Sequence, residues 1–497
     1  MRSIITIIML IFLISPPSLL NSEINKKEID RPDIINEEID SGINVENAHP
    51  YLKGDELTII YPKCSNPAIV EKGSTFTVII ENGGGLNCRA SVEISTAYEP
   101  VVDEYRLNII SCDVENELTY LEVYVPENVN EELYNLTVTT ANGFATEPRA
   151  VCIVDKIDGN FSFVHLTDFH IGDPRGMKVN IKETIGWKAA RKCIEEINLI
   201  HPDFVIITGD LVFGQLYPFE YSFEYKKLYE ILQEFDVPTY LCPGNHDLYI
   251  RAGQDGVKFW QRYFGSLYYS FDYGLAHFIM ANSYDWPKKS RVGFSYVVFN
   301  WGGYIEDEQL NWIENDLKNC NAKLKCIALH HNPLWETKND SLLGNEYYNR
   351  KELLKLIYEY GVDAVFAGHV HYDDVTIENE TLFITTTTSS SGLERDAYWG
   401  YRLIEVRNWG IYSYNYKEPK YSIPSYRLNC TFVNEYKVRI ENDLERDLNV
   451  LIEFVVPIDS YKAKNGEIVK IKSDGEKMQV YVRAKIEKNA EKEVYLL

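Results

Sequence analysis

Side chains that can bind metal ions or transfer protons follow five short apolar runs in the middle of the chain. The apolar runs are 161–166, 204–207, 239–242, 326–329 and 364–367. The polar clusters behind them are Asp168-Phe169-His170, Gly209-Asp210, Gly244-Asn245-His246-Asp247, His330-His331-Asn332-Pro333 and Gly368-His369-Val370-His371. These clusters hold an unusual share of the ten histidines, so we expect them to carry the chemistry of the chain.

The residue types in the clusters suit divalent metal ions. Carboxylate, amide oxygen and imidazole are ligands of such ions, and the clusters contain no cysteine, which disfavours a structural zinc site. The Asp-x-His and His-x-His spacings place alternate side chains on one side of an extended segment, so both can reach a metal. Glycines before Asp210, Asn245 and His369 allow tight turns that bring the backbone close to the site.

The elements that position these clusters alternate between strand and helix. Each apolar run is typical of a buried strand, and three segments between them place apolar residues on one helical face. These faces are Ala190, Cys193, Ile194 and Ile197; Tyr225, Leu228, Tyr229 and Leu232; and Leu353, Leu356, Ile357 and Tyr360. The alternation predicts an α/β domain with largely parallel sheets, in which ligands bind at the carboxyl ends of the strands.

Different patterns flank this region. Residues from Leu57 to about Val154 form short β-type runs separated by turns, which predicts an antiparallel β-sandwich. After Tyr412 a second β series predicts a small C-terminal β domain. The expected organisation is a signal peptide or N-terminal anchor at 1–22, an acidic linker at 23–50, the β-sandwich at 51–155, the catalytic domain at 156–415 and the C-terminal β domain at 416–497.

The N-terminus indicates export, and the cysteines are compatible with it. Residues 4–14 form an apolar run behind a basic start, which is too short for a membrane span and suits a signal peptide. We therefore expect an extracellular or cell-surface protein. Cys64, Cys88, Cys112 and Cys152 precede the catalytic region and could form two disulfides, with all three pairings open. The total of nine cysteines leaves at least one unpaired in a monomer.

The formal net charge of the chain is -24. So negative a surface repels nucleic acid phosphates, which argues against a nucleic acid partner. A phosphorylated substrate is still compatible with this charge, because bound metal ions reverse the sign of the field locally.

The order of the five clusters resembles the calcineurin-like metallophosphoesterases. Asp-x-His, Gly-Asp, Gly-Asn-His-Asp, His-x-Pro and Gly-His-x-His follow one another from Asp168 to His371, and the resemblance covers about 155–415. Each motif is weak alone, whereas all five in order are specific. The resemblance implies a four-layer α/β sandwich of two sheets, flanked here by the two β domains.

The resemblance also implies two metal ions and their ligands. Asp168, His170 and His371 would hold the first ion, and Asn245, His331 and His369 the second, with Asp210 bridging both. His331 is preferred to His330 because His331-Asn332-Pro333 matches the His-x-Pro element. His246 would face the substrate and Asp247 would orient it. A hydroxide between the ions would attack phosphorus in line, as expected of two-metal phosphoesterases.

One departure concerns the metal. Purple acid phosphatases, which also have an N-terminal β domain, carry a tyrosine three residues after the bridging aspartate, and this chain has Phe213 there. A tyrosinate–ferric pair is therefore not expected, and the two divalent ions are expected to be Mn, Fe or Zn.

Other polar residues near the clusters have simpler interpretations. His165 and His277 are expected to be hydrogen-bonded core histidines, and His330 is expected to point away from His331. The hydroxyl-rich run from Thr385 to Ser391 is interpreted as a strand that leads into a surface loop.

The sequence therefore predicts a secreted binuclear-metal phosphoesterase that hydrolyses phosphate mono- or diesters. Two alternatives stay open: a non-enzymatic surface protein, bound to the cell envelope, with a vestigial metal site, and a metal-dependent nuclease of the same superfamily. The complete set of seven ligands argues against the first, since clustered polar groups are costly to bury. The acidic charge argues against the second.

Overall fold

The computed structural model describes residues 57–82, 89–98, 100, 102–115, 118–173, 186–215, 219–294, 297–298, 300–335, 347–394 and 397–497. The expected signal peptide and acidic linker lie outside these residues. Among the described residues, no helix has the length and apolar character that crossing a membrane requires.

The first of two central sheets has the strand order β11-β10-β9-β22-β23, with β24 paired to β22. Its strands are β9 (Phe161–Leu166), β10 (Phe204–Thr208), β11 (Thr239–Cys242), β22 (Gly400–Arg407), β23 (Gly410–Ser413) and β24 (Ile423–Pro424). Strands β9, β10 and β11 are parallel, whereas β22 is antiparallel to β9. The carboxyl ends of the three parallel strands therefore meet at one edge, just before Asp168, Asp210 and Asn245.

The second central sheet has the order β14-β15-β18-β19-β21-β20. Its strands are β14 (Tyr269–Tyr273), β15 (Ala276–Met280), β18 (Leu324–Ala328), β19 (Ala364–Ala367), β20 (Asp374–Glu378) and β21 (Thr381–Thr385). The four inner strands are parallel, and the two edge strands are antiparallel to their neighbours. The carboxyl ends of β18 and β19 lead into the segments that carry His330 and His369.

The two sheets pack face to face through an aromatic core. Phe163 lies 5.1 Å from Phe204 in its own sheet and 5.5 and 5.4 Å from Phe278 and Phe366 in the other, between ring centroids. Neighbouring residues on β9 alternate between faces, so Val164 packs instead in the core on the outer side of the first sheet.

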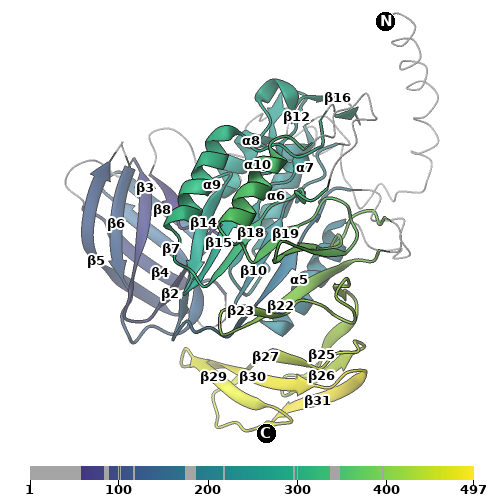
Figure 1. The fold of residues 1–497 in the computed structure, drawn as a ribbon. Coiled ribbons are helices and arrows are strands. Elements are labelled where there is room, and N and C mark those ends of the chain that lie inside the picture. The colour runs from purple at the N-terminus through teal and green to yellow at the C-terminus, as the bar shows by residue number, and fades with distance from the viewer. Residues whose placement is uncertain are drawn as a thin grey trace, which may run out of the picture. The chain divides into compact units, whose positions relative to one another are not determined.

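Helices cover both outer faces (Figure 1). Helices α5 (Gly186–Ile200), α6 (Glu220–Leu232) and α8 (Gly256–Phe264) pack on the first sheet, and α9 (Asp307–Asn319) and α10 (Arg350–Glu359) on the second. The central region is thus a four-layer sandwich of helices, two sheets and helices, as expected. The shorter elements are α7 (Asn245–Leu248), η2 (Lys288–Ser290), β12 (Ile250–Arg251), β13 (Gln254–Asp255), β16 (Gly293–Phe294) and β17 (Val297–Val298).

The N-terminal β region has eight strands in the order β1-β3-β6-β5-β4-β7-β8-β2. They are β1 (Thr58–Tyr61), β2 (Ala68–Glu71), β3 (Thr75–Glu81), β4 (Ser91–Thr96), β5 (Glu104–Glu115), β6 (Leu118–Tyr124), β7 (Glu132–Thr140) and β8 (Gly143–Val154). All pairs are antiparallel except β2 with β8. The first half of β5 pairs with β4 and its second half with β6, and the strands share one apolar core.

The C-terminal region has a four-stranded sheet, β25-β26-β31-β28, and a three-stranded sheet, β27-β30-β29. Its strands are β25 (Leu428–Asn434), β26 (Lys437–Asn442), β27 (Leu448–Pro457), β28 (Ala463–Lys464), β29 (Glu467–Ser473), β30 (Lys477–Ile486) and β31 (Ala490–Leu496). Its apolar side chains are continuous with the core around α5. Since β24 pairs with β22, the first central sheet extends beyond residue 415, where we expected a boundary.

The cysteines correct one expectation. Cys112 is disulfide-bonded, but Cys64 and Cys152 are free, so the prediction of two disulfides among the first four cysteines is wrong. The reason is the register of β2 and β8, which places Ile69 rather than Cys64 opposite Cys152.

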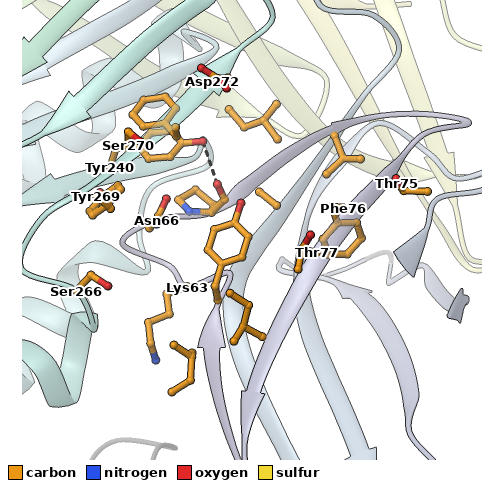
Figure 2. Close-up of a pocket in the computed structure, with 18 of the residues that line it drawn as sticks. Lys63, Asn66, Thr75, Phe76, Thr77, Tyr240, Ser266, Tyr269, Ser270 and Asp272 are labelled. Atoms are coloured by element: carbon orange, nitrogen blue, oxygen red, sulfur yellow. Dashed lines mark hydrogen bonds between the residues drawn. The ribbon is translucent and has the colours of Figure 1, made fainter. Parts of the chain in front are cut away.

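A cavity of about 590 Å³ lies beside β3 and β14 (Figure 2). Its lining includes Tyr61, Lys63, Phe76, Tyr269 and Asp272. None of the candidate metal ligands, all of which the structure describes, lines this cavity, so it is separate from the site described next.

Candidate metal centre

The carboxyl ends of the central strands bring acidic and imidazole side chains from both sheets together. Ligand atoms within 4.8 Å of one another form four overlapping groups: Asp168, His170 and His371; His170, Asp210 and His246; Asp168, Asp210 and His330; and His330, His331 and His369. Clusters separated by as many as two hundred residues in the chain thus form one site.

The first half of the site contains Asp168, His170 and His371. Nε2 of His371 lies 3.1 Å from Nε2 of His170 and 3.2 Å from Oδ1 of Asp168, and His170 Nε2 lies 3.4 Å from the same oxygen. Ligand atoms about 2.1 Å from one ion, at right angles to each other, lie about 3 Å apart. The three atoms are therefore spaced as ligands of a single divalent ion.

Asp210 connects this half to the second one. Its Oδ2 lies 3.4 Å from Nε2 of His170 and 3.1 Å from Nε2 of His330. His330 Nε2 in turn lies 3.2 Å from Nδ1 of His369. One carboxylate with imidazoles of both halves around it is the arrangement expected of a ligand that two ions share.

His331 has different surroundings from His330. Its Nε2 donates a hydrogen bond to the carbonyl oxygen of Trp301 at 2.8 Å, and its Nδ1 lies 2.9 Å from the hydroxyl of Ser283. Both ring nitrogens therefore have protein partners. His330 does not point away from the cluster as we expected, and the geometry favours it over His331 as a metal ligand.

One buried polar atom in the cluster fits a metal cation as its partner. Oδ1 of Asn245 is buried and has no hydrogen-bond partner among the described residues. The amide nitrogen of Asn245 donates to the hydroxyl of Tyr249, which leaves the amide oxygen as the available ligand atom. Because an unsatisfied buried acceptor is costly, a metal ion is the partner that this oxygen fits.

His246 lies at the more accessible side of the cluster. Its Nδ1 donates to the carbonyl oxygen of Phe213, whose ring stacks on the imidazole, and its backbone N–H donates to Oδ1 of Asp210 at 2.9 Å. Nε2 then faces the cluster, 3.9 Å from Oδ2 of Asp210. The side chain is 12% exposed, more than the buried carboxylates beside it.

The side chain of Asp247 is buried, and its carboxylate accepts hydrogen bonds from backbone N–H groups. Its Oδ1 accepts from the N–H groups of Leu211 and Val212 at 2.9 and 3.1 Å, and its Oδ2 accepts from Gly244 at 2.8 Å. These bonds tie the turn before α7 to the segment after Asp210. Asp247, which we predicted to be catalytic, therefore contacts the backbone that supports the site.

The charges of the cluster favour ionised carboxylates. Burial raises the pKa of Asp168, but the neighbouring imidazoles of His371 and His170 outweigh it and lower the pKa well below the usual range. The pKa of Asp210 is lowered in the same way, chiefly by His330. Burial lowers the pKa of His330, yet Asp210 raises it to about 9, whereas burial and His330 lower the pKa of His369 to about 4.

The backbone at the ligands is strained. Asp168, His170, Asp210, His369 and His371 all have φ between 43° and 77°, in the left-handed region. Non-glycine residues avoid this region, and such strain concentrates at functional sites. The close approach of Asp210 to the turn before α7 also requires glycine, because a Cβ on Gly244 would lie 2.2 Å from Oδ1 of Asp210.

The run from Thr385 to Ser391 corrects another expectation. It is completely buried rather than a surface loop. The hydroxyls of Thr388, Ser389 and Ser390 donate to three successive carbonyl oxygens, those of Asp168, Thr167 and Phe169. We call residues 386–391 the hydroxyl segment; it fixes the loop that carries the first two ligands. No local sequence signal distinguishes this buried run of Thr and Ser from an exposed one.

Two other histidines are satisfied core residues, as expected. His165 lies 2.8 Å from the hydroxyls of Thr208 and Thr386 through its two ring nitrogens. His277 contacts Asp272 at 2.7 Å and Asp316 at 3.0 Å. Neither belongs to a candidate metal group within the described part of the chain.

Comparisons with known proteins agree with the site. The family model "Calcineurin-like phosphoesterase" matches residues 161–373. "Purple acid phosphatase 23" of Arabidopsis thaliana is 29% identical over 204 residues, 34% of this chain and 41% of that protein. "Probable glycerophosphodiester phosphodiesterase GpdQ" of Arcobacter nitrofigilis is 27% identical over 237 residues, 47% of this chain and 80% of that protein.

Among solved structures, "Structure of PhoD" is similar with a TM-score of 0.39 and 12% identity, covering 80% of this chain and 86% of that one. A likeness at this score carries no functional conclusion. The matched segment spans less than half of the purple acid phosphatase. The family match ends at residue 373, so it contains every candidate ligand and excludes the flanking β regions.

Proposed function

We propose, because residues 161–373 belong to the calcineurin-like phosphoesterase superfamily, that this protein hydrolyses phosphate esters with the help of two divalent metal ions. The observation that carries the proposal is the pair of adjoining ligand groups around Asp210. Phosphate monoesters and diesters are both compatible with the site, and the relatives described above are named as acting on one or the other class.

The proposed ligands differ in one residue from those expected from the sequence. Asp168, His170 and His371 would hold one ion and Asn245, His330 and His369 the other, with Asp210 shared. His330 takes the place of His331 because its Nε2 contacts both Asp210 and His369, and both nitrogens of His331 have other partners. When bound, the ions supply positive charge for the phosphate oxygens and lower the pKa of water.

The chain's own residues have two tasks beside the ions. His246 is proposed to hold the proton that the leaving oxygen takes up, because its Nδ1 is fixed by Phe213 and its Nε2 faces the cluster. Such general acid catalysis contributes roughly two to four orders of magnitude in rate. Asp247 is proposed to position this turn through its three backbone hydrogen bonds.

Manganese, iron(II) and zinc are the proposed metals. Phe213, three residues after Asp210, stacks its ring on His246 and has no side-chain oxygen that could bind an ion. Imidazole and carboxylate ligands without thiolate suit these ions.

Export is proposed from residues 4–14 alone, which places the enzyme outside the cell or at its surface. The formal net charge of -24 favours a small phosphate ester over nucleic acid as substrate. A vestigial metal site in a cell-envelope protein is the alternative. It is opposed by the strained backbone at five ligands, since strain without a function would be a pure loss of stability.

The test compares p-nitrophenyl phosphate with bis-p-nitrophenyl phosphate as substrates of chelated protein, with Mn(II), Zn(II), Fe(II) or no metal restored. Turnover that requires metal, and that Asp210→Asn lowers by at least two orders of magnitude, is expected. The preferred ester separates monoesterase from diesterase activity. Metal bound at two ions per chain without turnover of either ester would favour the vestigial alternative.

A further inference from the structure

Asn245 and Tyr249 lie one helical turn apart, at the two ends of α7. Residues i and i+4 share a helix face, so the two side chains meet. The amide nitrogen of Asn245 donates to the hydroxyl of Tyr249. We propose that Tyr249 is a positioning residue that fixes the Asn245 amide with its oxygen toward the metal centre. The inference rests on the proposed function only in taking Asn245 as a metal ligand.

An asparagine ligand has an orientation problem that aspartate does not have. The side-chain amide carries an oxygen acceptor on one arm and an NH₂ donor on the other, and the two arms have nearly the same shape. Only the oxygen binds a cation, so a rotation of the amide by half a turn replaces a ligand by two N–H donors. A partner that accepts from the nitrogen therefore selects the productive orientation.

Tyr249 is held firmly enough to act as that partner. Its side chain is completely buried, and its ring packs edge-on against Tyr284 at 5.6 Å and beside His246 at 5.3 Å, between centroids. Its backbone carbonyl accepts from the N–H of Gly256 at 2.9 Å. Ring and backbone fix the hydroxyl oxygen in place, so it stabilises the amide orientation in which the nitrogen donates to it and the amide oxygen faces the metal centre.

The other arm of the amide has no competing partner among the residues that the structure describes. Asn245 is 1% exposed, and its Oδ1 is buried without a hydrogen bond. The turn that carries it lies directly against Asp210, whose Oδ1 accepts from the backbone N–H of His246 at 2.9 Å. A buried acceptor beside a shared carboxylate ligand is what a cation would satisfy, and a reversed amide would turn N–H groups toward that cation instead.

The test is a double-mutant cycle that combines Tyr249→Phe with Asn245→Asp. Each variant is first freed of metal with a chelator, and its affinity for Mn(II) is then measured by calorimetric titration. Removing a partner of a metal ligand typically weakens binding about 10–100-fold. We expect this loss at one of the two sites for Tyr249→Phe alone. In the Asn245→Asp background we expect less than about a threefold effect, because either carboxylate oxygen can bind metal and no orientation must be selected.

Tyr225→Phe is the matched control. Tyr225 is another buried tyrosine whose hydroxyl donates to the same turn, at 2.7 Å, but to the backbone carbonyl of Asp247 instead of meeting the Asn245 amide. This variant should keep wild-type Mn(II) affinity. Circular dichroism checks that each variant folds. Tyr249→Phe is the least disruptive change available, because it removes one oxygen and keeps the ring that packs on Tyr284 and His246.

Unchanged Mn(II) affinity in Tyr249→Phe would overturn the proposal. An equal loss in the wild-type and Asn245→Asp backgrounds would do the same, because it would mean that the turn, not the amide, is disturbed. The titration contains no substrate, so wild-type protein that binds two ions but hydrolyses nothing would refute the proposed function alone. Wild-type protein that binds none of Mn(II), Zn(II) and Fe(II) would refute both.

Discussion

His330 and His331 are neighbours in the chain, yet their ring nitrogens meet different partners. His330 Nε2 lies 3.1 Å from Asp210, whereas His331 is bonded to Ser283 and Trp301. His330→Ala is therefore expected to remove one bound metal ion per chain and most of the activity, by two orders of magnitude or more. His331→Ala should change metal affinity by less than about tenfold, because both of its ring nitrogens bond to residues outside the proposed ligand set.

Metal content by mass spectrometry and the rate of p-nitrophenyl ester hydrolysis measure both variants side by side. The reverse pattern, with metal lost only from His331→Ala, would restore the assignment that the His-x-Pro spacing suggested. The spacing alone could not decide, because both histidines precede Pro333 and a shift of one residue at the end of a strand reverses which side chain faces the site.

A second prediction at this scale concerns His277, on β15. Burial lowers its pKa, but the hydrogen bonds that it donates to Asp272 and Asp316 outweigh burial and raise the pKa to about 10. Because the pKa of His277 is higher in the folded than in the unfolded chain, the protonated imidazole stabilises the fold. This stabilisation is complete below the unfolded pKa of about 6.5, and it is lost as the pH rises through about 10. His277→Gln should lower the free energy of unfolding by about 1 kcal/mol at pH 6 and by nothing above pH 10.

Urea denaturation at pH 6, 8 and 10.5 measures this difference. Asp316→Asn is the matched variant, because it removes one of the two partners and should show a smaller loss with the same pH dependence. A loss that is independent of pH would show that packing, not charge, explains the effect of His277→Gln.

The hydroxyl segment supports a prediction at the scale of elements. Thr388 Oγ1 donates to the carbonyl of Asp168 at 2.7 Å and accepts from the N–H of Ser391 at 2.9 Å. Thr388→Val keeps the shape of the side chain but leaves that buried carbonyl without a donor, at a cost of about 1–3 kcal/mol. Since this carbonyl belongs to Asp168, a proposed metal ligand, Mn(II) affinity should fall by at least about tenfold as well.

Thr381→Val is the control for this variant. Thr381 is also buried and donates to a carbonyl, that of Val362 at 2.8 Å, at the start of β21 and thus away from the ligands. Thermal unfolding and Mn(II) titration should show a similar loss of stability in both variants but a loss of affinity only in Thr388→Val. Equal affinities would reduce the hydroxyl segment to a structural role.

The elements that position the site were predictable to different degrees. The runs 161–166, 239–242 and 364–367 coincide with β9, β11 and β19, because these parallel strands are covered on both faces and are almost completely buried. The edge strands β14 and β20 were not predicted. The alternation of buried and exposed side chains in these strands is interrupted by exposed polar residues such as Asp272. Such a pattern is typical of the edge of a sheet, but in the sequence it resembles a loop.

The hydroxyl segment was misread for a related reason. Thr and Ser are usually exposed, and nothing local indicates that a run of them is buried. Their burial depends on the carbonyls of residues 167–169, which lie more than two hundred positions earlier in the chain. Contacts of this range determine the site, so the sequence predicted which residues gather there better than how each side chain is used.

At the scale of the whole molecule, bound metal should stabilise the fold. The ligands come from both central sheets, from β9 to β19, so only the folded chain brings them together. An ion present at one hundred times its dissociation constant contributes about 2.7 kcal/mol per site. Chelation should therefore lower the melting temperature by several degrees, since about 1 kcal/mol corresponds to 2–4 °C for a domain of this size.

Differential scanning calorimetry of chelated and Mn(II)-restored protein measures this shift. Asp210→Asn, which alters the shared ligand, should show a much smaller difference between the two states. Identical melting temperatures of the wild type with and without metal would contradict the view that the two sheets are joined by the ions.

The left-handed backbone at five ligands has a consequence for how this chain can change. Each non-glycine residue in that conformation costs about 1 kcal/mol or more, so together they consume a substantial part of the roughly 5–15 kcal/mol by which a domain is stable. Glycine would adopt the same conformations without strain. Replacement of these residues by glycine would therefore relieve local strain while it removes the proposed ligands, so stability and metal binding make opposite demands on the same five positions.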